Sequence, residues 1–198
     1  MAESKYFKIP KTNSLVAVSL YMVLGFCALV YGILNIESTL LSKAVLPFAG
    51  ALFFTFIEYV AHRFLYHSGE DYTNEANWQY TMHGVHHVHP NDKGLLAMPI
   101  LLALVLAAAF FGLFYLAMND NAFFFWPGFL MGYAGYLYVH YTIHARKAPS
   151  NVFGYLWKHH LLHHHIYDDK AFGVTSPLWD FVFRTMPPKK ALHRKARE

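Results

Sequence analysis

The chain is poor in charged residues and in cysteine. Only 14% of its 198 residues are charged, whereas soluble domains average about 25%. Hydrophobic residues make up 56% of the chain, which indicates a membrane protein. The single cysteine, Cys27, lies in an apolar run, so disulfides and thiolate metal sites within the chain are excluded. Any metal site must therefore be built from other side chains.

The small excess of positive charge does not indicate a nucleic-acid partner. The formal net charge is +4, but the basic residues flank apolar segments instead of forming a patch interleaved with aromatic residues. We therefore expect no nucleic-acid partner.

Four apolar segments are long enough to predict membrane spans, since a helix needs about 20 residues to cross a bilayer. They cover approximately residues 15–36, 44–61, 95–118 and 122–141. A cleaved signal peptide is an alternative for the first, but that segment is too long and no small-residue cleavage site follows it. The predicted fold is an all-α integral membrane four-helix bundle.

The basic residues predict how the bundle is oriented. Four spans place both termini and the loop 62–93 on one side of the membrane, and all but Lys43 of the 16 Lys and Arg residues fall on that side. This bias predicts that the side is cytoplasmic. We expect a polar segment 1–14 followed by one domain, 15–198, in which residues 62–93 and 145–198 form a cytoplasmic helical cap.

Histidine is abundant, and its spacing is regular. Five of the eight residues in Lys158–His165 are histidine, and the spacing i, i+3, i+4 places three of them on one helix face. A second triplet has this spacing, and two histidine pairs lie at the predicted span ends. Together these ten candidate metal ligands are His62, His67, His83, His86, His87, His140, His144, His160, His163 and His164.

The ten histidines form a geometric pseudo-repeat. A shift of 77 residues superimposes His67 on His144 and the triplet beginning at His83 on the one beginning at His160. Each half offers five imidazoles, which suits two metal ions, although the sequence leaves open which histidine serves which ion. A histidine-rich surface that titrates near pH 6 is the alternative, but it does not explain the register.

Some residues near these clusters are candidates for hydrogen bonding to the ligands. His62 and His67 lie about 140° apart on a regular helix, so we expect the helix to end near His67 and the pair to turn inward. Glu58, one turn before His62, is expected to accept a hydrogen bond from a ligating imidazole, with a water-facing carboxylate as the alternative. His159, beside the second triplet, is a candidate for this role or for contact with substrate.

The composition of the predicted site favours a redox centre. Nitrogen ligands without cysteine argue against an iron–sulfur cluster, and a structural zinc needs only four ligands. A haem held by two histidines would leave eight unexplained. We therefore expect two iron ions, which zinc could replace in purified protein because it binds such ligands more tightly.

The pattern HxxxxH, HxxHH, HxxxH, HxxHH resembles that of the integral-membrane fatty acid hydroxylase and sterol desaturase superfamily. The surrounding text is similar to the fatty acid 2-hydroxylase branch: Glu58-Tyr59 before His62, His83-Gly84-Val85-His86-His87 followed by Pro90 and Asp92, and the motif Phe172 to Asp180. The resemblance covers approximately residues 56–185.

This resemblance implies a di-iron oxygenase that uses dioxygen and two electrons to hydroxylate carbon 2 of a long acyl chain. The family's ligand positions correspond to the ten histidines given above, and Asp180 is a further candidate near the ligands. Members of this family often carry an N-terminal cytochrome domain that donates the electrons. The short polar segment 1–14 is not expected to contain one, so the electrons are expected from a separate protein.

Two alternatives remain for the function. A sterol or carotenoid hydroxylase or desaturase belongs to the same superfamily, although the motif from Phe172 to Asp180 favours the acyl branch. A membrane metal-binding or transport protein would place its ligands near the bilayer midplane, whereas these histidines follow the span ends. The sequence does not distinguish a free acid, a thioester or a ceramide as substrate.

Overall fold

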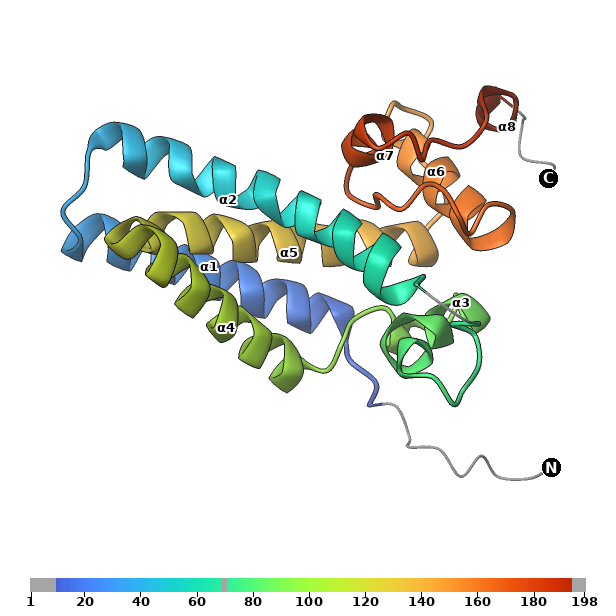
Figure 1. Cartoon of the computed structure of the whole chain (residues 1–198), viewed down its shortest axis with the longest axis horizontal. Coiled ribbons are helices and arrows are strands. Elements are labelled where there is room, and N and C mark those ends of the chain that lie inside the picture. Colours follow the sequence, from blue (N-terminus) through green and yellow to red (C-terminus); the bar gives the residue numbers. More distant parts are fainter. Residues whose placement is uncertain (1–9, 69–70, 194–198) are drawn as a thin grey trace.

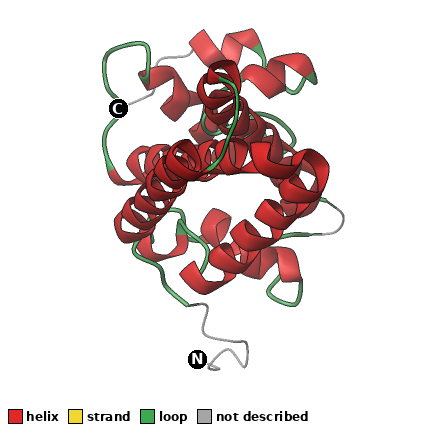
Figure 2. Ribbon diagram, turned by 90° about the vertical axis from the view of Figure 1, so that its left-hand side faces the viewer, coloured by secondary structure: helices red, strands yellow, loops and turns green. Residues whose placement is uncertain are grey.

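Four long helices form the body of the molecule in the computed structural model, which describes residues 10–68 and 71–193 (Figure 1). They are α1 (Ser14–Asn35), α2 (Leu40–Val60), α4 (Ile100–Met118) and α5 (Ala122–Ala145). All regular structure in the described ranges is helical, so the predicted all-α bundle is confirmed (Figure 2). Parts of the predicted N-terminal segment and cap, residues 1–9 and 194–198, lie outside the described residues.

The outer surface of this bundle suits a bilayer. Three helical stretches are long and apolar enough to cross a membrane, and the third, Lys93–Ala145, folds back at a short 3₁₀ turn (η4, Asn119–Asn121) into α4 and α5. Large apolar side chains such as Leu34, Phe48 and Leu116 are more than three-quarters exposed. Exposed apolar surface of this extent indicates contact with lipid.

The helix ends differ from the predicted spans for local reasons. The segment predicted from residue 95 begins a long helix only at Ile100, because Pro99 disfavours helical backbone at the residue before it. In contrast, α5 continues beyond residue 141 to Ala145, so it carries His140 and His144 on one regular helix. At α1, the Asn13 side chain accepts hydrogen bonds from two backbone N–H groups of the first turn.

Glycine allows α2 and α5 to approach closely. A Cβ atom at Gly50 would collide with the backbone of Phe125, and one at Gly128 would collide with the backbone of Pro47. Membrane helices use small residues in this way because close backbone packing replaces the hydrophobic drive available in water. This contact fixes the spacing of the helices whose ends carry His62 and His140.

The histidine-bearing segments cover one end of the bundle, where α1 begins and α5 ends (Figure 1). Two π-helical turns, η1 (Ala61–Tyr66) and η2 (Tyr80–Gly84), are followed by the short helices α3 (Val85–Val88) and η3 (Lys93–Leu95). The remaining elements of this cap are α6 (Gly154–His165), α7 (Leu178–Val182) and α8 (Lys189–His193).

We predict that Gly128→Ala lowers the midpoint of thermal unfolding in detergent, by an amount corresponding to about 1–3 kcal/mol, because the added methyl group overpacks the contact with α2. The control is Gly112→Ala on α4, where a Cβ would meet nothing within 4 Å. Alanine is also the better helix former there, so this variant should be unchanged or more stable. Equal destabilisation by both changes would contradict the close-contact interpretation.

Candidate metal centre

The ten predicted histidines converge into two groups of five. Group A consists of His62, His67, His83, His87 and His163, and group B consists of His86, His140, His144, His160 and His164. Each histidine contributes one imidazole nitrogen, and within each group these five nitrogens all lie within 4.8 Å of one another. Among the described residues, these are the two groups of three or more His, Cys, Asp or Glu side chains that are gathered closely enough to hold a metal ion.

A π-helical turn brings His62 and His67 together. As expected, the helix that starts as α2 ends next to His67, at Tyr66; its last part is the π-helical η1, where the N–H of His67 donates to the carbonyl of His62 at 3.2 Å. A π turn pairs residue i with residue i+5, so residues five apart become neighbours on one face. The two ring centroids are 5.0 Å apart as a result.

Each triplet contributes to both groups. In the first, His83 and His87 belong to group A while His86 faces group B; in the second, the roles are reversed and His163 alone faces group A. The Nε2 atoms of His86 and His140 are 2.9 Å apart, and those of His163 and His67 are 3.2 Å apart. The two halves of the pseudo-repeat therefore exchange one histidine each.

Hydrogen bonds on the outer side of three rings determine which nitrogen points inward. The Nδ1 atoms of His62, His163 and His140 face the carbonyl oxygens of Phe172 (2.5 Å), Lys170 (2.8 Å) and Leu96 (3.3 Å). A carbonyl can only accept, so each Nδ1 carries the proton and each Nε2 presents a lone pair to its group. The Nε2 of His62 is buried and has no hydrogen-bond partner among the described residues.

The imidazoles of the cap are held in their neutral form. Burial, together with repulsion from His163, lowers the pKa of His67 to about 3, and burial lowers the pKa of His163 to about 4. Burial followed by repulsion from adjacent imidazoles also places the pKa of His83, His86 and His160 well below the usual value. Neutral imidazole is the metal-binding form.

These observations fit a cation in each group. Where the Nδ1–H donates outward, as in His62, His140 and His163, the inward Nε2 has only a lone pair and cannot donate to another ring. A divalent ion accepts several nitrogen lone pairs at once. The histidines of both groups are thus suitable ligands for metal ions.

The three residues predicted to support the ligands lie just outside group A and group B. Glu58 makes no hydrogen bond to any imidazole that the structure describes; instead its carboxylate accepts from the backbone N–H groups of Val174 (2.6 Å) and Thr175 (2.9 Å). The expected direct contact is replaced because this loop lies between Glu58 and the rings. His159 is buried and its Nε2 is 3.0 Å from the carboxylate of Asp180, so it does not face a substrate cavity.

An apolar cavity of about 380 Å³ extends from the histidines into the bundle between α2, α4 and α5. At the end of the cavity nearest the cap, histidines of both groups contribute to the lining: His62 and His83 from group A, and His86 and His140 from group B. Leucine and phenylalanine side chains line much of the remainder. The cavity thus connects the interior of the helical bundle with both groups.

Tyr133 and Tyr136 line this cavity and were missed by the sequence reasoning. They precede His140 by seven and four residues on α5, so helical periodicity places them on its face. That spacing was a usable signal. The Tyr136 ring stacks on His140 with a centroid distance of 5.4 Å.

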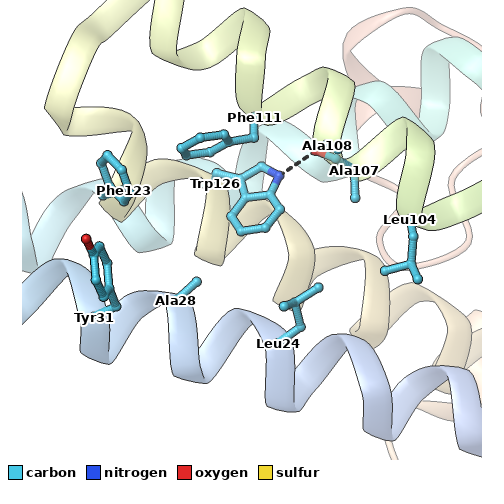
Figure 3. A pocket seen from close by; sticks show the side chains of 9 residues that line it. All are labelled: Leu24, Ala28, Tyr31, Leu104, Ala107, Ala108, Phe111, Phe123 and Trp126. Carbon is cyan, nitrogen blue, oxygen red and sulfur yellow. Dashed lines mark hydrogen bonds between the residues drawn. The ribbon is translucent and has the colours of Figure 1, made fainter.

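A second hollow, of about 440 Å³, lies on the other side of α4, between α1, α4 and α5. Its lining is almost entirely apolar, and Phe111, Phe123 and Trp126 form one end (Figure 3). The indole N–H of Trp126 donates to the carbonyl of Ala107 at 2.8 Å and ties α4 to α5 (Figure 3). Described histidines do not line this hollow.

The fold and the site define a helical membrane protein with a histidine-rich centre that can hold metal. Residues 47–185 match the family described as fatty acid hydroxylase, and the chain belongs to this family.

Similar proteins agree with this family. The dihydroceramide fatty acyl 2-hydroxylase FAH2 of Arabidopsis thaliana is 38% identical over 150 residues, which cover 74% of this chain and 62% of that protein. The fatty acid 2-hydroxylase of Mus musculus is 34% identical, over 81% of this chain and 44% of that protein. The chain thus spans less than two thirds of the length of these relatives.

A solved structure of full-length scs7p, in which only the hydroxylase domain is visible, has the same fold. The TM-score is 0.80 at 31% identity, and the match covers 96% of this chain and 71% of that one.

We predict that each histidine group holds one metal ion. The double variant His83→Ala/His163→Ala should lose the ion of group A, and His144→Ala/His164→Ala that of group B, each lowering the metal content of purified protein by about one equivalent. The measurement is elemental analysis after reconstitution with one divalent metal and removal of the excess.

The matched control is His89→Ala/His165→Ala, which removes two exposed histidines outside both groups. Its metal content should equal that of the native chain. Metal loss in this control, or none in either test variant, would contradict the assignment of ligands to two groups.

Proposed function

We propose that the protein is a membrane di-iron oxygenase that hydroxylates a long acyl chain at carbon 2, with the ten histidines of groups A and B as its metal ligands. The single observation that carries this proposal is that both groups border one apolar cavity within the bundle. The similar proteins of Arabidopsis thaliana and Mus musculus are named as fatty acyl and fatty acid 2-hydroxylases, which supports the same reaction.

The proposed metals are two iron ions, which supply the oxidising chemistry when dioxygen and two electrons are provided. The chain's own contribution is to hold the substrate and exclude water. The cavity wall formed by Leu106, Phe110 and Phe129 would surround the alkyl tail. With the polar end of the acyl group beside the histidines, carbon 2, which is bonded to the carbonyl carbon, would lie close to groups A and B.

We propose that the cap faces the cytoplasm and that a separate protein delivers the electrons there. The bias of Lys and Arg toward the predicted cytoplasmic side supports this orientation. The beginning of α1 and the helix α8 lie at the same end of the bundle as the cap (Figure 1), as expected for four spans. We further propose that residues 15–198 act as one domain.

A transport function is less consistent with the site. Transporters bind their substrates near the bilayer midplane, along a pathway that opens to both sides. Here the ligands lie at the ends of α2 and α5 and in the cap. The cavity below them is lined mainly by apolar side chains, which do not suit passage of an ion.

We predict that cells expressing the native chain with a competent electron donor contain acyl chains that are heavier by one oxygen. Fragmentation in mass spectrometry should place this oxygen at carbon 2. The variant His163→Ala should yield none, because it removes a ligand of group A, whereas the adjacent control His165→Ala should retain the product. A hydroxyl or double bond found instead on a sterol or carotenoid would contradict the acyl assignment.

We also predict that Phe110→Ala shifts the products toward longer acyl chains. Phe110 lines the cavity ten residues beyond the start of α4, about 15 Å along the helix, so its truncation lengthens the space for the tail. The readout is the chain-length distribution of 2-hydroxy products from a mixed pool of acyl substrates.

Phe111→Ala is the matched control for this change. It removes the same side chain at the next position, but Phe111 lines the hollow on the other side of α4 and not the cavity (Figure 3). The control should lose a comparable amount of packing without changing chain-length preference. A similar shift in both variants would show that general loosening of α4, and not cavity depth, sets the preference.

A further inference from the structure

The segment 170–175, which we call the outer loop, contacts two ligands of the same histidine group. It lies between α6 and α7, and its carbonyls at Lys170 and Phe172 face the Nδ1 atoms of His163 and His62 at 2.8 Å and 2.5 Å. Both histidines belong to group A. One loop thereby fixes the ring orientation of two ligands that are 101 positions apart in the chain.

Two buried carboxylates hold the outer loop from opposite ends. Asp180 accepts from the N–H groups of Phe172 at 2.9 Å and Gly173 at 2.8 Å, and its exposed fraction is 0%. Glu58 accepts from the N–H groups of Val174 and Thr175 and also from the Thr175 hydroxyl. Carboxylates are seldom buried unless several donors satisfy them, and here four of the donors are backbone N–H groups of this loop.

The loop has a backbone conformation that needs such support. Ala171 has a φ angle of 59°, in the left-handed region that is unfavourable for a residue with a Cβ atom. Its N–H donates to the carbonyl of Thr185 at 2.9 Å, and the Thr185 hydroxyl donates to Asp180 at 2.7 Å. Contacts on both sides thus keep the Lys170 and Phe172 carbonyls directed at the rings.

Group B has less support of this kind. Between described residues, its one hydrogen bond from a ring Nδ1 to a carbonyl joins His140 to Leu96, at the longer distance of 3.3 Å. The Nδ1 atoms of His86, His160 and His164 are buried without a hydrogen-bonding partner in the described ranges of the protein. The two groups therefore offer a similar set of nitrogens but differ in how firmly the rings are held.

We propose that Asp180 and Glu58 are positioning residues for the metal of group A, acting through the outer loop, and that group A binds metal more tightly than group B. The inference rests on the proposed metal binding by both groups. The physical reason is that an acceptor on Nδ1–H fixes the ring and makes its Nε2 a stronger donor to the metal. Neither carboxylate contacts the metal itself in this arrangement.

Two single-group backgrounds separate the effect on each group. The variant His144→Ala/His164→Ala leaves group A intact, and His67→Ala/His83→Ala weakens group A while keeping both histidines that contact the outer loop. Zn²⁺ affinity is measured in each by competition with a chelator of known affinity. The background with group A should bind Zn²⁺ more tightly than the one with group B.

Asp180→Asn and Glu58→Gln are then introduced into both backgrounds. Each should weaken Zn²⁺ binding by group A about 10–100-fold, the usual cost of losing a supporting contact to a ligand. Binding by group B should change by less than about threefold, because sites without shared partners couple weakly: Asp180 contacts His159, beside His160, but in the described structure neither carboxylate hydrogen-bonds a ligand of group B. The two variants act on different ends of the loop, so misfolding of one does not remove the test.

Asp169→Asn is the matched control. Asp169 precedes the loop directly, but its side chain is 68% exposed and pairs only with Lys170 in the described structure. The same change of charge there should leave Zn²⁺ affinity unaltered in both backgrounds.

Equal weakening of both groups by Asp180→Asn and Glu58→Gln would overturn the proposal, since it would indicate a general loss of structure. Unchanged affinity of group A would overturn it as well. If both backgrounds bind Zn²⁺ as expected but the native chain forms no hydroxylated acyl product, the proposed reaction fails while this inference stands. If neither background nor the native chain binds Zn²⁺, both fail together.

Discussion

The inward-facing lone pairs of ten imidazoles are the constraint on which the remaining structure depends. Burial keeps these rings neutral, so protonation does not relieve their crowding, and a ring whose Nδ1–H points outward, such as His62 or His163, has only a lone pair to present inward. Each group could hold a cation, and that would satisfy the constraint. The close α2–α5 contact at Gly50 and Gly128 also helps to bring the rings together. This contact sets the distance between the helix ends that carry ligands for the two groups.

Local backbone geometry distributes the ligands between the groups. The π turn at η1 brings His62 and His67 onto one face, while the regular helix of α5 does the same for His140 and His144 with a spacing of four. In each triplet the residues at i and i+4 face one group and the residue at i+3 faces the other. The first half of the chain supplies one ligand of group B, and the second half supplies one ligand of group A. Neither group is complete without both halves, so the two hairpins of the fold are coupled.

The surroundings of the two groups are unequal even though their ligands are alike. The outer loop, held by Glu58 and Asp180, provides carbonyl acceptors for two rings of group A, whereas group B has one longer contact to Leu96. The cavity meets both groups, so a hydrocarbon chain held there would approach a centre with one firmly and one loosely supported half. Such asymmetry arises from the chain connection between α6 and α7, which passes only one side of the centre.

The sequence by itself determined the four apolar helices, the identity of the ten converging histidines and the family, because span length, helical spacing and motif order are local properties. It did not determine that Glu58 would contact backbone N–H groups at Val174 and Thr175, which are over a hundred residues away. Nor could it show that His86 and His163 exchange groups, or that a π turn joins His62 to His67. Only the tertiary structure decided these points. They depend on how helices that are distant in the sequence pack together, and on which side of each histidine ring meets another residue.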